Sequence, residues 1–337
     1  MTVRAFISGC AGARITPQER AFFAEADPWG FILFARNVED PAQVRALVDA
    51  LREAVGRAAP VLIDQEGGRV QRLRPPFWPE YPPAEVFGDL YARDAAAALT
   101  AVRLNSRAMA GDLSALGIDV DCLPVADLRH PDGHGIIGNR AYGETPQKVA
   151  ALARAAADGL LDGGVLPVVK HIPGHGRAPA DSHERLPVVA APRAVLEQED
   201  FAAFRALADL PLAMTAHVVY RDIDPDHPAT TSPVMIGEVI RRDIGFSGLL
   251  MSDDLSMGAL AGSLAERGRA AIAAGCDMLL HCNGVLAEMA EVASVSPALS
   301  GPAAQRADRA LALRRNAEPQ DVAALRAEVQ HLLSPEA

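Results

Sequence analysis

The chain has 337 residues, of which half are hydrophobic and only 5% aromatic, and its formal net charge is −11. This composition is typical of a folded globular protein and excludes a largely disordered one. The negative charge opposes non-specific attraction to nucleic acid or anionic lipid, and no apolar run reaches the ~18 residues that span a bilayer. We therefore expect a cytoplasmic protein with no nucleic-acid partner and no membrane partner.

Eight short segments are apolar throughout rather than alternating, which is typical of strands buried on both faces. These predicted strands are Arg4–Ser8, Gly30–Phe34, Val61–Asp64, Asp119–Pro124, Leu166–His171, Leu212–His217, Leu249–Asp253 and Met278–His281. Helical patterns lie between them, among them Pro41–Val55, Ala92–Ala115, Thr145–Asp162, Ala194–Ala208, Pro233–Arg242 and Ala261–Ala274. Three more helix-like segments follow the last strand and end near Leu333.

A strand followed by a helix, repeated in this way, predicts an α/β fold of the (β/α)8 TIM-barrel type. We expect one domain, residues 1–337, with extra C-terminal helices. An open doubly wound sheet shares the alternation, but it usually carries a Gly-rich phosphate turn after its first strand. The segment from Gly9 to Ala13 fits that turn poorly.

Polar side chains follow five of the predicted strands at the point where each strand ends. They lie in the segments Asp64–Arg72, Pro124–Asp127, Lys170–His171, at His217, and in Ser252–Asp254. In a barrel of this type the carboxyl ends of the strands meet at one face, where the active site lies. The sequence therefore predicts a site rich in carboxylates, imidazoles and cations at that face.

The tripeptide Asp181-Ser182-His183 follows the fifth predicted strand, in a stretch interrupted by Gly and Pro. On extended backbone, side chains two residues apart point to the same side. The Asp181 carboxylate can then orient the His183 ring and stabilise its protonated form. This arrangement indicates a pair for acid/base catalysis.

Two chemistries can use such a set of residues. In glycoside hydrolysis, Asp253 would attack the anomeric carbon and a separate group would donate the proton. In metal-assisted hydrolysis, zinc ligands would come from His171, His175, His183, His217 and Asp253. Against the metal, a Pro-Gly pair separates His171 from His175, and the sequence has no His-x-His. A metal-dependent amidohydrolase-like barrel and a non-catalytic amino-sugar sensor remain the alternatives.

Four blocks of the sequence resemble the bacterial family 3 glycoside hydrolases, specifically the β-N-acetylglucosaminidases of peptidoglycan recycling. The blocks are Ile63–Arg72, Gly138–Gly143, Lys170–His183 and Gly245–Met257. The order and spacing of the set are more specific than any one block. The short chain is similar to the Gram-negative type, in which the loop that bears the acid/base pair belongs to the barrel and closes over the substrate.

The resemblance implies a retaining exo-β-N-acetylglucosaminidase that acts on muropeptides such as N-acetylglucosaminyl-1,6-anhydro-N-acetylmuramic acid. It implies that Asp253 is the nucleophile and that His183, paired with Asp181, is the acid/base. It also implies that the residues that bind N-acetylglucosamine are Asp64, Arg72, Arg140, Lys170 and His171. Since adjacent strand residues point oppositely, we expect only one of Asp253 and Asp254 to face the pocket. We expect a monomer that needs no metal ion and no organic cofactor.

Overall fold

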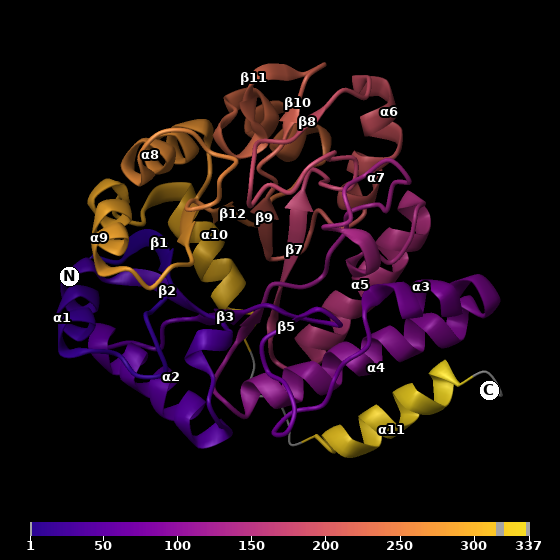
Figure 1. Cartoon of the computed structure of the whole chain (residues 1–337), viewed down its shortest axis with the longest axis horizontal. Helices are drawn as coiled ribbons and strands as arrows, with labels where there is room; N and C mark the ends of the chain where they lie inside the picture. Colours follow the sequence, from indigo (N-terminus) through magenta and orange to yellow (C-terminus); the bar gives the residue numbers. More distant parts are fainter. Residues whose placement is uncertain (1, 315–319, 335–337) are drawn as a thin grey trace.

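The computed structural model describes residues 2–314 and 320–334. Its centre is a closed barrel of eight parallel strands, and their order around the barrel is their order along the chain (Figure 1). The strands are β1 (Arg4–Ser8), β2 (Pro28–Leu33), β3 (Val61–Ile63), β6 (Val120–Asp121), β7 (Leu166–Ile172), β9 (Leu212–Thr215), β12 (Leu249–Asp254) and β13 (Met278–His281). All eight predicted strands are present, and the predicted (β/α)8 barrel is confirmed.

Helices surround the barrel (Figure 1). They are α1 (Pro17–Ala26), α2 (Pro41–Val55), α3 (Ala84–Arg93), α4 (Ala95–Ser114), α5 (Pro146–Asp162), α6 (Arg193–Gln198), α7 (Asp200–Arg205), α8 (Leu264–Ala274), α9 (Leu286–Val295), α10 (Gly301–Leu311) and α11 (Val322–Leu333). Shorter 3₁₀ turns are η1 (Ala35–Asn37), η2 (Gly138–Arg140) and η3 (Ala229–Thr231), and η4 (Met235–Asp243) is a π-helix. No helix in the described parts of the chain is long and apolar enough to cross a membrane.

Three predicted helices differ from the observed ones. Ala92–Ala115 is interrupted at Asp94, whose side chain accepts a hydrogen bond from the Ala97 backbone N–H at 3.0 Å and so begins α4. Ala194–Ala208 is broken at Glu199, which separates α6 from α7. Pro233–Arg242 is wound more loosely than an α-helix, because hydrogen bonds such as Ile244 N–H to Val239 O span five residues.

The interior of the barrel is an apolar core to which all eight strands contribute. Its strand residues include Ala5, Ile7, Trp29, Ile32, Leu62, Val120, Leu166, Val168, Leu212, Met214, Leu249, Met251, Met278 and Leu280. Because this core is packed, the barrel has no open channel, and any pocket at the carboxyl ends of the strands has a closed floor. Ile32, Met214 and Leu280 form part of that floor.

Two small sheets and the C-terminal helices lie outside the barrel. β4 (Gln65–Gly67) pairs with β5 (Val70–Gln71), and β10 (Val219–Tyr220) pairs with β8 (Val188–Val189) and β11 (Asp224–Pro228). The α11 helix packs against α4 (Figure 1). These additions leave one end of the barrel open to the loops that follow its strands.

Candidate active site

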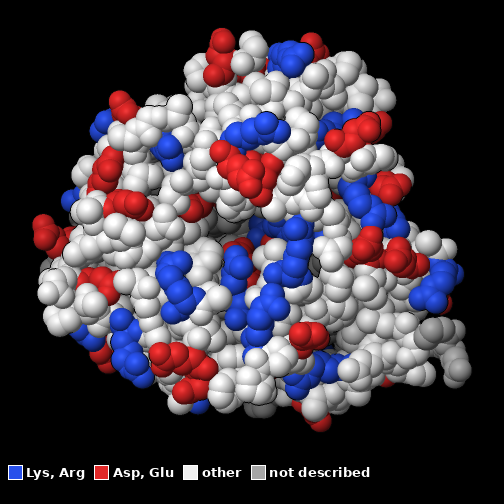
Figure 2. All heavy atoms as spheres, in the orientation of Figure 1, with Lys and Arg blue, Asp and Glu red and all other residues white. Residues whose placement is uncertain are grey.

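A pocket of about 270 Å³ opens at the carboxyl ends of the barrel strands. Figure 2 shows the hollow in this face, with Lys and Arg side chains gathered along one rim and a group of acidic side chains across from them. Seven of the eight predicted site residues line the pocket, namely Asp64, Arg72, Arg140, Lys170, His171, His183 and Asp253. The eighth, Asp181, contacts His183 from outside the lining.

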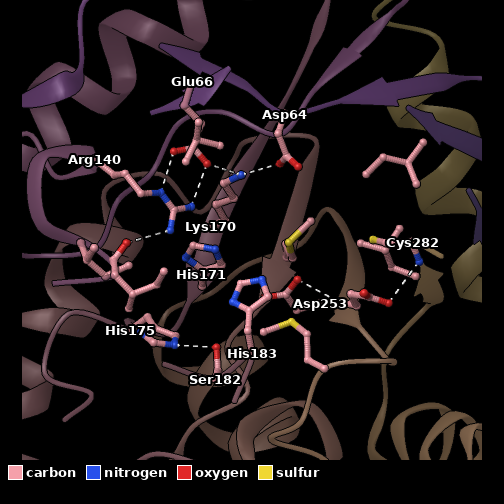
Figure 3. Close-up of a pocket in the computed structure, with 18 of the residues that line it drawn as sticks. Asp64, Glu66, Arg140, Lys170, His171, His175, Ser182, His183, Asp253 and Cys282 are labelled. Atoms are coloured by element: carbon pink, nitrogen blue, oxygen red, sulfur yellow. Dashed lines mark hydrogen bonds and ion pairs between the residues drawn. The ribbon is translucent and has the colours of Figure 1, made fainter. Parts of the chain in front are cut away.

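One wall of the pocket is an ion-pair network centred on Lys170, at the end of β7 (Figure 3). Its Nζ lies 2.9 Å from Asp64 Oδ1 and 2.6 Å from Glu66 Oε1. Arg72 Nη2 donates to Asp64 Oδ2 at 2.8 Å, and Arg140 makes two parallel bonds of 2.8 Å to Glu66. We call these five residues the paired wall. Each carboxylate in it therefore contacts two cations.

The charges of the paired wall fix its protonation state. Burial acts to raise the pKa of both carboxyl groups, but the neighbouring cations outweigh it. Lys170 and Arg72 hold the pKa of Asp64 well below its usual range, and Arg140 and Lys170 lower the pKa of Glu66 to about 2. Burial alone would lower the pKa of Lys170, yet Asp64 and Glu66 raise it. All members of the wall are ionised at neutral pH.

A tight hairpin explains how Asp64 and Arg72 meet although they are eight residues apart. The β4–β5 hairpin turns through Gly67 and Gly68, both of which have positive φ. A Cβ on Gly67 would lie 2.4 Å from the Pro82 carbonyl oxygen, so a larger residue does not fit there. The glycines thus return the chain so that Arg72 faces the carboxylate at the end of β3.

A second polar chain lies beside the wall and centres on the buried Asp127. His171 Nδ1 lies 2.7 Å from Asp127 Oδ2, and the backbone N–H groups of His171 and His175 donate to Oδ1 at 3.2 and 2.6 Å. His175 Nε2 lies 3.0 Å from the Ser182 hydroxyl. Burial, then the field of His171, lower the pKa of His175 to about 4, so this ring is neutral at pH 7. Asp127 therefore connects a pocket-lining imidazole with the loop that bears His183.

The predicted Asp181–His183 pair is formed, but in a turn over residues 182–184 and not on the extended backbone expected from the sequence. His183 Nδ1 lies 2.9 Å from Asp181 Oδ1, and the same oxygen accepts the His183 backbone N–H at 2.9 Å. Partial burial acts to raise the pKa of Asp181, but these contacts with His183 lower it. The His183 side chain is 65% exposed, and Figure 3 shows its ring directed toward Asp253. With Nδ1 held by the carboxylate, Nε2 is the nitrogen free to exchange a proton.

Asp253 lies near the end of β12 and lines the pocket. Burial acts to raise its pKa, but His217, His171 and the Asp254 backbone N–H together lower it, so the group is a carboxylate at neutral pH. The Asp254 N–H donates to Asp253 Oδ1 at 2.8 Å. The other carboxylate oxygen has no hydrogen bond within the described residues that would occupy it, which suits a group that must react.

The prediction that only one of Asp253 and Asp254 faces the pocket is wrong, because both line it. The alternation of strand residues breaks down there, since the register of β12 against β13 shifts between Met251 and Asp254. The carboxylate of Asp254 is nevertheless engaged. Its oxygens accept the Ser256 hydroxyl at 2.6 Å and the Cys282 backbone N–H at 3.1 Å.

Several lining residues were not among the predicted site residues: Glu66, Arg69, His175, Ser182 and Asp254. Glu66 lies inside the predicted Ile63–Arg72 block, but nothing in its sequence shows that it pairs with Arg140. His217, considered as a zinc ligand, is buried and contacts Thr230 Oγ1 at 2.7 Å and the Asp254 carbonyl at 3.0 Å. None of the imidazoles considered as zinc ligands belongs to a group of three potential metal ligands within 4.8 Å of one another in the described ranges.

Comparison with known proteins agrees with this geometry. Residues 9–312 match the model of the glycosyl hydrolase family 3 N terminal domain. A beta-hexosaminidase of Alkalilimnicola ehrlichii is 44% identical over 292 residues, which are 84% of this chain and 82% of that protein. A beta-hexosaminidase of Chromobacterium violaceum is 38% identical over 335 residues, 96% of this chain and 93% of the relative.

Solved structures give the same result. NagZ from Neisseria gonorrhoeae, in complex with N-trifluoroacetyl-D-glucosamine, superposes with a TM-score of 0.89 at 33% identity and covers 99% of both chains. Native NagZ from the same organism gives a TM-score of 0.88 at 34% identity, again over 99% of both chains. The chain therefore belongs to glycosyl hydrolase family 3 and is a glycoside hydrolase of the β-hexosaminidase kind.

Proposed function

We propose that the protein is a retaining exo-β-N-acetylglucosaminidase that removes terminal non-reducing N-acetylglucosamine from muropeptides. The proposed substrates are N-acetylglucosaminyl-1,6-anhydro-N-acetylmuramic acid and its peptide forms, met in the cytoplasm during cell-wall recycling. The proposed enzyme acts as a monomer, and its catalysis requires no metal ion and no organic cofactor. The observation that carries the proposal is an ionised Asp253 in the pocket, toward which the Asp181-bound imidazole of His183 is directed (Figure 3).

In the proposed first step the Asp253 carboxylate attacks the anomeric carbon while His183 Nε2 donates a proton to the glycosidic oxygen. The bond to the leaving sugar breaks, and a covalent glycosyl-Asp253 ester remains. In the second step neutral His183 takes a proton from water, and the water oxygen attacks the anomeric carbon and releases Asp253. Asp181 supports the charge that the imidazole carries in each cycle.

The paired wall is proposed to bind the hydroxyl groups of the sugar. Lys170 has three N–H donors and uses two on Asp64 and Glu66, so one remains for a ligand. Arg140 uses Nε and Nη2 on Glu66 and Nη1 on the Ile136 carbonyl, so its main effect is to orient Glu66. His171 donates from Nδ1 to the ionised Asp127, which leaves Nε2 toward the pocket.

The closed floor supports exo action. Because Ile32, Met214 and Leu280 of the barrel core close the pocket from below, a glycan chain can enter only by its end. That the related Neisseria enzyme binds N-trifluoroacetyl-D-glucosamine supports an N-acylated glucosamine at this position. The muropeptide aglycone rests on the resemblance to the peptidoglycan-recycling enzymes.

The test is turnover of 4-nitrophenyl β-N-acetylglucosaminide beside the corresponding β-glucoside, each with and without a chelator, followed by the natural anhydro-disaccharide. We expect hydrolysis of the two N-acetylglucosaminides alone, unchanged by the chelator and with retention at the anomeric carbon. Loss of activity with the chelator in a chain that circular dichroism shows to stay folded, and loss that a His130→Ala variant shares, would favour the metal-dependent amidohydrolase instead. Binding without turnover would favour the sugar sensor.

A further inference from the structure

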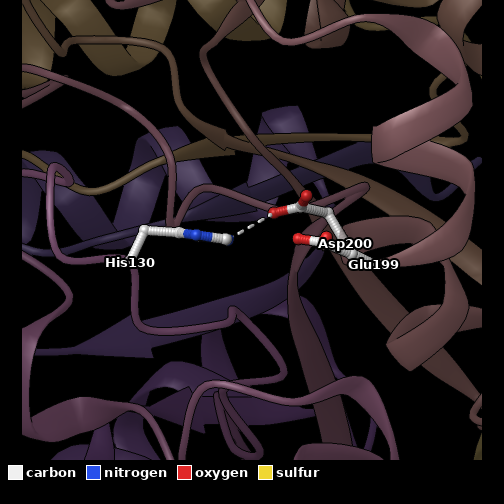
Figure 4. Close-up of side chains that lie close together, drawn as sticks. All are labelled: His130, Glu199 and Asp200. Atoms are coloured by element: carbon white, nitrogen blue, oxygen red, sulfur yellow. Dashed lines mark ion pairs between the residues drawn. The ribbon is translucent and has the colours of Figure 1, made fainter.

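A second cluster of ionisable side chains lies outside the active-site lining, at the base of the loop that bears His183. It consists of His130 in the segment after β6, Glu199 between α6 and α7, and Asp200 at the start of α7 (Figure 4). One ligand atom from each residue lies within 4.8 Å of the other two. None of the three lines the pocket that holds Asp253.

Two atoms of this cluster are buried without a hydrogen bond. His130 Nε2 and Asp200 Oδ1 face each other at 3.4 Å, and neither has a hydrogen-bond partner in the described part of the chain. The Asp200 side chain is only 1% exposed. The two atoms lie at ion-pair distance, but neither makes a hydrogen bond (Figure 4). Buried polar atoms without hydrogen bonds are costly, so a group bound to both would stabilise them.

The separation of the two atoms fits a metal ion between them. Ligand atoms about 2.05 Å from a tetrahedral zinc ion lie roughly 3.3 Å apart. This is close to the 3.4 Å observed between His130 Nε2 and Asp200 Oδ1. We propose that these atoms, with a carboxylate oxygen of Glu199, bind a divalent transition-metal ion such as zinc. Glu199 is 46% exposed on its side chain, so its carboxylate can rotate the remaining distance.

Arg177 holds the carboxylates from the other side. Its Nε donates to Asp200 Oδ2 at 2.6 Å, and its Nη2 contacts Glu199 Oε2. Carboxylates that bind metals are commonly oriented by such outer hydrogen bonds. Two carboxylates against one guanidinium leave one negative charge, which favours a cation. The nitrogen-and-oxygen donor set favours zinc-like ions over Ca²⁺ or Mg²⁺, which prefer oxygen ligands throughout.

The ion would connect three segments of the chain. His130 belongs to the loop after β6, Arg177 to the loop after β7, and Asp200 to α7. The site would therefore be structural, and its occupancy would stabilise the base of the loop that presents Asp181 and His183. His130 also lines a second pocket of about 330 Å³, which Glu199 and Asp200 do not line.

The proposal is tested on the full chain after removal of metals with a chelator. Zinc binding is measured by isothermal titration and by metal content after dialysis, and Co²⁺ is used to report the ligand set by its absorption spectrum. The variants are His130→Ala, the more exposed Glu199→Gln, and His134→Ala as a matched control from the same loop. Asp200 is left unchanged because it is buried and holds Arg177.

We expect one zinc ion per chain in the wild type and in His134→Ala, and a rise of the thermal unfolding midpoint with zinc in both. In His130→Ala and Glu199→Gln zinc affinity should fall by at least about tenfold, since loss of groups that merely support ligands already costs that much. A His183→Ala chain should keep the ion. Equal zinc binding by wild type and His130→Ala, loss of binding only in His183→Ala, or no zinc binding by the wild type would each overturn the proposal.

Discussion

The two sides of the active-site pocket are built on different principles. The paired wall consists of buried and partly buried charges, each with at least one close partner, and it rests on the barrel strands and the β4–β5 hairpin. The opposite side is a loop, residues 173–187, whose His183 side chain is 65% exposed. We call this loop the acid/base loop. Its first part is anchored by the bond from His175 N–H to Asp127 and by the ion pair of Arg177 with α7. Residues 183–186, in contrast, form an exposed tip that is held by backbone hydrogen bonds such as Gly258 N–H to His183 O at 3.0 Å.

This difference indicates which part of the site has its catalytic geometry before substrate binds. Removing one partner from a buried ion pair costs about 3–5 kcal/mol, whereas an exposed pair contributes about 1 kcal/mol or less. The paired wall therefore keeps its geometry in the absence of ligand. The exposed tip of the acid/base loop, residues 183–186, can change position at lower cost, and proton transfer depends on where this tip lies.

The largest expected effect is on the barrel side of the comparison. Asp253→Ala should lower kcat by at least about 10⁴-fold, because loss of the nucleophile removes the covalent route. Asp254→Asn should cost far less, since that carboxylate is engaged by Ser256 and Cys282. Steady-state kinetics on the 4-nitrophenyl substrate measure both, with circular dichroism as a control for folding. If Asp253→Ala kept near-normal activity and Asp254→Asn were inactive, the nucleophile would be Asp254 and not Asp253.

The next effect concerns the acid/base loop and depends on the leaving group. His183→Ala should lower the rate on the natural disaccharide by about 10²–10⁴-fold, because a poor leaving group needs protonation. The loss on the 4-nitrophenyl glycoside should be much smaller in the glycosylation step. Asp181→Ala should show the same pattern more weakly, because it only orients the ring and supports its charge. An equal loss on both substrates would rule out His183 as the proton donor.

His175, which lies between the paired wall and the tip of the acid/base loop, should make the free energy of unfolding depend on pH. His175 is buried, and its folded pKa of about 4 lies below its ordinary value of 6.5, so the unfolded chain binds the proton more tightly. Its contribution is complete above pH 6.5 and is lost as the pH falls toward 4, on the order of 3 kcal/mol. Urea unfolding of His175→Gln between pH 7 and 4 should lack this decline, whereas His134→Gln should retain it. The same slope in His175→Gln and wild type would contradict the assignment.

A smaller effect is expected from moving the acid/base loop without touching its catalytic residues. A Cβ on Gly258 would lie 2.7 Å from the Glu184 carbonyl oxygen and 2.8 Å from that of His183, so Gly258→Ala should displace the loop outward. We expect kcat to fall about tenfold with little change in KM. Gly237→Ala is the matched control, because its Cβ meets no atom within 4 Å. Equal kcat values for the two variants would show that loop position does not limit turnover.

The barrel could be predicted from the sequence because its strands are buried on both faces and therefore read as apolar runs. The positions of Asp64, Lys170, His171 and Asp253 followed from the same rule, since each stands at the end of such a run. The helices were harder to predict. Helical periodicity marks both segments as helical, but it does not report the break at Glu199 or the loose winding of η4.

The pairing within the site could not be predicted in the same way. Glu66 meets Arg140 across 74 positions of sequence, and Asp127 meets the backbone of His175 across 48. Such contacts depend on where loops return to the barrel. The Asp181–His183 pair was accessible because both partners lie within three residues, although a turn and not extended backbone brings them together.

Asp127 also fixes the backbone at the start of the acid/base loop. Its carboxylate accepts the backbone N–H of both His171 and His175, which fixes the length of chain between them. Gly176 adds a limit, because a Cβ there would lie 1.7 Å from the Leu128 carbonyl oxygen. Insertions and deletions before residue 177 would therefore displace His171 from the pocket. Beyond it, Ala178, Ala180 and Ser182 are still buried, and residues 183–186 form the exposed tip of the loop. The proton donor therefore lies on the one stretch of this loop that packing leaves exposed, and changes of sequence at the tip would alter the donor while the paired wall stays intact.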